Sequence, residues 1–83
     1  MKTLGDAVGR LDPTNRALLD LNLRRGMDEA EIAEVLSVDA GEVSSRRTEI
    51  LDGLASELGL SSREDRDEMR ATLPDLPARY WKG

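Results

Sequence analysis

The sequence predicts an all-α protein, a small helical bundle that contains a helix-turn-helix and carries an extended C-terminal tail. Strand signals are missing, because no alternating β-branched runs are joined by a hairpin turn. Helix-capping residues recur ahead of apolar residues at three- and four-residue spacing. The 83 residues include no cysteine and no phenylalanine, so a thin aliphatic core has to hold one domain together.

We expect the central part of the domain, which contains the helix-turn-helix, to span residues 12–58. Its first helix begins at Asp12-Pro13. Aspartate is a favoured N-cap residue, and proline fits the first helical position. Apolar residues continue at helical spacing until Gly26, which favours a helix end. Residues 1–11 are expected to add a short helix through their apolar residues, Leu4, Val8 and Leu11.

Two further helices complete this central part of the domain. Asp28 is expected to cap the first of them, with Glu31 placed to complete a capping box, and this helix should end near Ser37. Asp39 is expected to cap the second, which is long and should end at Gly59. The apolar positions that we assign to the shorter helix are Ile32, Ala33, Val35 and Leu36.

The C-terminal third is predicted to hold one charged helix and a tail. Ser61 and Glu64 have the spacing of a capping box, which places a helix over residues 61–73 and closes the domain at residues 1–73. Pro74 and Pro77 favour an extended tail over residues 74–83. Tyr80 and Trp81, the two aromatic residues of the chain, lie in this tail. They are candidate partner-binding residues, whereas the alternative is that Trp81 folds back over the core.

The helices around residues 37–39 have the spacing of a helix-turn-helix, in which the helix after Asp39 would be the recognition helix. Residues 11–58 resemble region four of bacterial sigma factors and the related LuxR-type helix-turn-helix. The resemblance is carried by Leu11-Asp12-Pro13, Arg16, Leu18-Leu19, Leu21, Gly26, the segment from Glu31 to Val38, Val43, Arg46 and Leu54.

This resemblance implies a domain that binds promoter DNA through its recognition helix and that contacts RNA polymerase. Carried over by position, the DNA-contacting residues would be Glu42, Ser44, Ser45, Arg46 and Arg47. The chain departs from the family pattern at Ser37, where glycine is usual, and at Asp39, where serine or threonine is usual. It also has fewer basic residues after Arg47 than the family usually has.

The charge of the chain opposes the DNA interpretation. The net charge is −5, and residues 28–45 contain six acidic residues and no basic one. An acidic surface is not attracted to a phosphate backbone. Two hypotheses therefore stay open. One is a transcription-associated regulator that binds DNA; the other is an acidic module that binds a protein such as RNA polymerase. In the second hypothesis, Arg46 pairs with Glu42 or Glu49.

Composition also limits the other classes of function. Histidine and cysteine are missing, and no phosphate-binding loop or nucleophile motif is present, so we expect neither an enzyme, nor a metal site, nor a cofactor. No apolar run could span a membrane, which favours a cytoplasmic protein. An apolar strip near the end of the long helix predicts a homodimer that uses either this helix end or the N-terminal segment. The strip comprises Ile50, Leu51, Leu54, Ala55 and Leu58.

Overall fold

The computed structural model describes residues 3–82, which are helical with short connections, as the sequence predicts. Met1, Lys2 and Gly83, at the ends of the expected N-terminal segment and tail, lie outside the described residues. The helices are α1 (Leu4–Gly9), α2 (Pro13–Leu19), α3 (Glu29–Leu36), α4 (Ala40–Glu57) and α5 (Arg63–Thr72). A π-helical segment, η1 (Asp20–Arg24), continues α2, and two 3₁₀ turns, η2 (Leu73–Asp75) and η3 (Ala78–Tyr80), follow α5.

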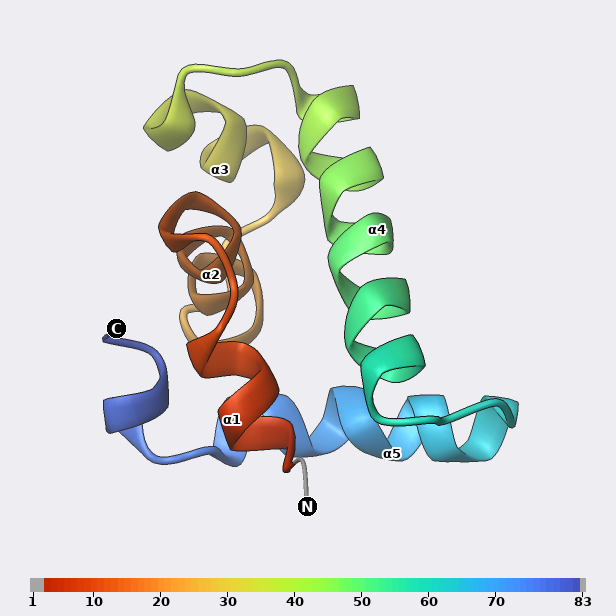
Figure 1. Ribbon diagram of the computed structural model, residues 1–83. Helices are drawn as coiled ribbons and strands as arrows, with labels where there is room; N and C mark the ends of the chain where they lie inside the picture. Colours follow the sequence, from red (N-terminus) through yellow and green to blue (C-terminus); the bar gives the residue numbers. More distant parts are fainter. Residues whose placement is uncertain (1–2, 83) are drawn as a thin grey trace.

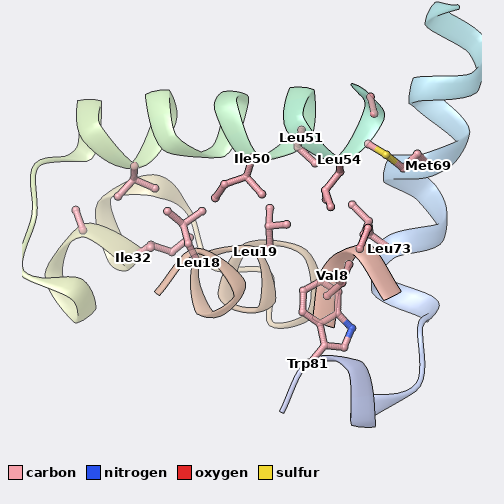
Figure 2. Close-up of a cluster of buried hydrophobic side chains, with 14 residues drawn as sticks. Val8, Leu18, Leu19, Ile32, Ile50, Leu51, Leu54, Met69, Leu73 and Trp81 are labelled. Carbon is pink, nitrogen blue, oxygen red and sulfur yellow. The ribbon is translucent and has the colours of Figure 1, made fainter. Parts of the chain in front are cut away.

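The long helix α4 organises the molecule. It stands along one side in Figure 1, with α1, α2 and α3 opposite, and α5 runs across its C-terminal end. Helices α1, α2, α3 and α5 each pack against α4. One core of aliphatic side chains fills the space between them (Figure 2). Its fully buried side chains are Val8, Leu18, Leu19, Ile32, Val43, Leu54 and Leu73.

The helix starts follow the capping chemistry of the sequence, with two differences. Asp12 caps α2, and Asp28 and Glu31 form both hydrogen bonds of a capping box at α3. Asp39 is the N-cap residue of α4, but its side chain makes no capping hydrogen bond. Helix α5 is capped by Ser62 and not by Ser61, so it begins one residue later than expected. The backbone N–H of Asp65 donates to the Ser62 hydroxyl.

Three residues in the left-handed backbone region end helices. Gly26 (φ 67°) and Gly59 (φ 71°) have this conformation, as their predicted roles require. Ser37 (φ 58°) has it as well, at the turn between α3 and α4. The turn therefore keeps the backbone shape that glycine would adopt most easily, with serine in its place.

The apolar strip of α4 is part of the core of the monomer. Ile50, Leu51, Leu54 and Ala55 are buried, and Leu58 is partly buried. These residues face the other helices of the same chain, so they are not available to a second copy. The homodimer stays a prediction, and this apolar strip does not support it.

The C-terminal tail folds back onto the domain. Among its described residues, the tail turns at η2 and η3, and between these turns the backbone runs through Leu76 (φ −63°, ψ 144°) and Pro77 (φ −53°, ψ 145°). Trp81 is 6% exposed and belongs to the core cluster, where Figure 2 shows its indole ring on the α1 side. Burial of one large ring by a chain with so thin a core explains why the tail does not stay extended.

Candidate interaction face of the helix-turn-helix

Helices α3 and α4 form the helix-turn-helix that the sequence predicts. The connection runs from Ser37 to Asp39, and the backbone N–H of Val38 closes it by donating to the carbonyl of Ala33 at 3.0 Å. Ile32 and Val43 are fully buried between the two helices and their neighbours. Ala33, a small residue, is 7% exposed and belongs to the same core cluster. This packing leaves the first half of α4 at the surface.

The residues predicted to contact DNA lie together on this half of α4. Glu42 and Ser45 are exposed, whereas Ser44, Arg46 and Arg47 are partly buried. The structure therefore brings the predicted set to one helix and one region of the surface. The structure also shows the ion-pair partner of Arg46 and of Arg47.

Both arginines of the recognition helix are paired with carboxylates. The Arg46 guanidinium lies 3.1 Å from a carboxylate oxygen of Glu42, one helical turn earlier. The Arg47 guanidinium lies 3.0 Å from a carboxylate oxygen of Glu29, at the start of α3. The first pair is one of the alternatives left open by the sequence. The second links the two helices, and sequence spacing could not show it because the partners are 18 positions apart.

Other arginines near the bundle are paired in the same way. Arg10 contacts Glu57 at 2.6 Å, joining α1 to the end of α4. Arg24 and Arg25 both contact the Asp20 carboxylate, at 2.9 and 3.7 Å. These cations are partly or fully neutralised by the protein itself, so they add little positive potential to the surface.

The exposed part of the helix-turn-helix is acidic. Residues 28–47 contain six carboxylates and two arginines, a formal charge of −4. Besides Glu29 and Glu42, the acidic residues are Asp28, Glu31, Glu34 and Asp39, all of them exposed. We call the exposed surface of α3 and of the first half of α4 the acidic face.

Val35 lies on the acidic face, with 58% of its surface exposed, the only large hydrophobic residue so placed among residues 3–82. Val35 is one of the four apolar positions that the sequence assigns to this helix, and the structure leaves it at the surface. The buried arc of α3 runs from Ile32 to Ala33, and Val35 falls outside it on the helical wheel. The acidic face thus has one apolar side chain among its carboxylates.

Tyr80 and Trp81, the predicted partner-binding residues, lie at η3, which packs against α1. Trp81 is buried, and the Arg24 guanidinium lies 5.8 Å from the centre of its ring. Tyr80 is partly exposed, and its hydroxyl accepts a hydrogen bond from Arg79 at 3.1 Å, which raises the pKa of the Arg79 guanidinium. Of the two aromatic rings, only that of Tyr80 is open to a partner.

Comparison of the chain with protein-family models, with curated proteins and with solved structures gives no match. The resemblance to sigma region four therefore depends on the residues of the sequence and on the α3–turn–α4 geometry. Within residues 3–82, every helix is too short or too polar to span a bilayer.

Proposed function

We propose that this protein is a transcription-associated helix-turn-helix module whose acidic face binds a basic surface of a protein partner. RNA polymerase is the first candidate partner, since contact with polymerase is one of the two roles that the resemblance to sigma region four implies. The observation that carries the proposal is the pairing of both recognition-helix arginines with carboxylates, at 3.0 and 3.1 Å.

The electrostatics of the acidic face support a protein partner over DNA. Exposed ion pairs contribute only about 0–1 kcal/mol, so a phosphate could in principle displace Glu42 from Arg46. The displaced carboxylate would nevertheless stay on the same helical turn, where it repels the phosphate. With six carboxylates around two arginines, the face attracts cations, and lysine or arginine side chains of a protein supply them.

Val35 gives this face an apolar contact. Specific interfaces combine a desolvated apolar centre with a polar rim. Glu31 is one helical turn before Val35, so an exposed carboxylate lies on the same side of the helix as this apolar side chain. A partner with an apolar residue flanked by lysine or arginine would complement this arrangement.

The proposal is tested by photocrosslinking to purified RNA polymerase core enzyme. A photoreactive amino acid is placed at position 35, and in a control protein at exposed position 67 of α5. We expect a crosslink from position 35 that is lost in the Glu31→Lys/Glu34→Lys variant and kept in Glu64→Lys/Glu68→Lys, which changes the net charge equally. Equal crosslinking from positions 35 and 67 would contradict the proposal.

DNA binding is the second candidate function. It is favoured by the exposure of Ser45 and the surface position of Ser44 and Arg46 on the first half of α4, where a recognition helix would meet a groove. In that case Arg46→Ala would cost about 1–3 kcal/mol and relax specificity at one base, whereas Arg47→Ala would weaken all sequences alike. A homodimer would then be needed, since one short recognition helix gives little affinity.

A further inference from the structure

A cavity of about 300 Å³ lies between η1, the middle of α4 and α5. This volume is at the lower end of the range for small-molecule sites. The cavity is lined by Asn22, Leu23, Arg47, Thr48, Leu51 and Arg70. Three elements distant in sequence thus contribute to one open cavity.

The chemistry of this cavity differs from that of its neighbours. Two arginines line it and no carboxylate does, although the chain has 17 acidic residues and 12 basic ones. The cavity of about 240 Å³ between α2 and α4 includes Glu49 and Glu57, and the cavity at the start of α3 includes Asp28 and Glu29. Of these three cavities, only the one of about 300 Å³ is lined by arginine and by no carboxylate.

Arg70 is the available cation of this wall. Its side chain is exposed and makes no hydrogen bond or ion pair with any of residues 3–82. Arg47 already pairs with Glu29, but a guanidinium has five N–H donors and can serve a second acceptor. Thr48 adds a hydroxyl to the lining. A carboxylate matches the planar donor fork of a guanidinium.

The rest of the lining includes two leucines. Leu51 is 7% exposed and belongs to the core, and Leu23 packs against it as a partly buried residue. The π-helical geometry of η1 fixes Leu23 and its neighbour Asn22, whose side-chain amide donates to the carbonyl of Met27 at 3.1 Å. A ligand here would meet both hydrogen-bond donors and hydrocarbon.

We propose that this cavity binds a small monocarboxylate with a short hydrocarbon chain, its carboxylate on Arg70 and Arg47 and its chain on Leu23 and Leu51. The cavity meets the acidic face at Arg47, which pairs with Glu29, and a bound ligand would make the protein responsive to a small molecule. The proposal does not depend on whether the acidic face binds a protein or DNA.

The test is an NMR titration of the full chain with acetate, butyrate and hexanoate, and with inorganic phosphate, at constant ionic strength. We expect saturable shifts of the Asn22 side-chain amide and the Thr48 backbone amide. Each added methylene should tighten binding about fourfold, from the transfer free energy of one methylene. Shifts that do not saturate, or phosphate binding as tightly as hexanoate, would overturn the proposal.

Matched variants assign the shifts to this cavity. Arg70→Gln should weaken hexanoate binding about tenfold, because it removes a charged hydrogen bond. Thr48→Val keeps the side-chain volume and should also weaken binding. Arg63→Gln, on the same helix but outside the lining, should leave the affinity unchanged. An equal loss in Arg63→Gln and Arg70→Gln would show general charge attraction and would overturn the assignment.

Discussion

The ring of Tyr80 covers the backbone of Gly5 so closely that a β-carbon on Gly5 would lie 2.7 Å from the ring. This contact joins η3 to α1 and so holds the end of the chain against its beginning. A side chain at position 5 and a ring at position 80 therefore exclude each other.

Gly5→Ala should lower the free energy of unfolding by about 1 kcal/mol, since overpacking outweighs the gain in helix propensity. Gly53→Ala, an interior position of α4 with open space around it, should instead raise it by about 0.5–1 kcal/mol. Denaturant titrations measure both. In a Tyr80→Ala background the effect of Gly5→Ala should become stabilising; if it stays destabilising, the Tyr80 ring is not the cause.

Trp81 is predicted to contribute through its ring and not through its indole N–H. The ring is buried, and its Nε1 has no hydrogen-bond partner within residues 3–82. Trp81→Ala should cost roughly 3–5 kcal/mol, as for other buried aromatic residues. Trp81→Phe removes the unpaired N–H along with some apolar surface, so it should cost less than about 1.5 kcal/mol. Thermal unfolding followed by circular dichroism compares the two, and equal losses would contradict this account.

Ser37 has a backbone conformation that glycine adopts without strain. Ser37→Gly should raise the free energy of unfolding by about 0.5–1 kcal/mol, because the left-handed conformation costs an L-residue about 1–2 kcal/mol. Ser45→Gly, an exposed position inside α4, should lower it by about 0.5 kcal/mol. Denaturant midpoints give both values. A Ser37→Gly variant that is less stable than the parent would show that the serine side chain stabilises the turn.

Ala33 is predicted to be intolerant of size because it lies where α3 meets α4. Ala33→Leu should destabilise the fold by about 1–3 kcal/mol. Ala30→Leu, on the exposed side of the same helix, should change stability by less than about 0.5 kcal/mol. Chemical denaturation of the pair distinguishes packing from helix propensity, since the substitution is identical. Equal stability of both variants would contradict the close packing of α3 on α4.

The features that the sequence predicted well are those with local causes. The capping box of Asp28 and Glu31 and the helix ends at Gly26 and Gly59 depend on residues within one turn. The helix-turn-helix follows from two such helices and a short connection. The start of α5 differs from the prediction by one residue because Ser61 and Ser62 are adjacent and either could act as the N-cap.

The features that the sequence did not predict depend on tertiary packing. The π-helical segment η1 lies between α2 and Gly26, and its apolar spacing is that of an ordinary helix. The pairing of Arg47 with Glu29 requires the relative position of α3 and α4. The sequence lists Val35 as an apolar position without showing that it is exposed, because a short helix with four apolar residues does not show which of them its neighbours cover. These contacts decide the electrostatics of the candidate site.

The central claim is that carboxylates on the helix-turn-helix keep this protein from binding DNA. The most direct test is fluorescence anisotropy of a labelled mixed-sequence duplex, titrated with the protein at low and at physiological ionic strength. The account predicts no saturable binding by the parent chain. Glu29→Gln/Glu42→Gln, which frees both arginines, should gain salt-sensitive binding, whereas the control Glu64→Gln/Glu68→Gln on α5 should not. Saturable, salt-sensitive binding by the parent chain that Arg46→Ala abolishes would contradict the account.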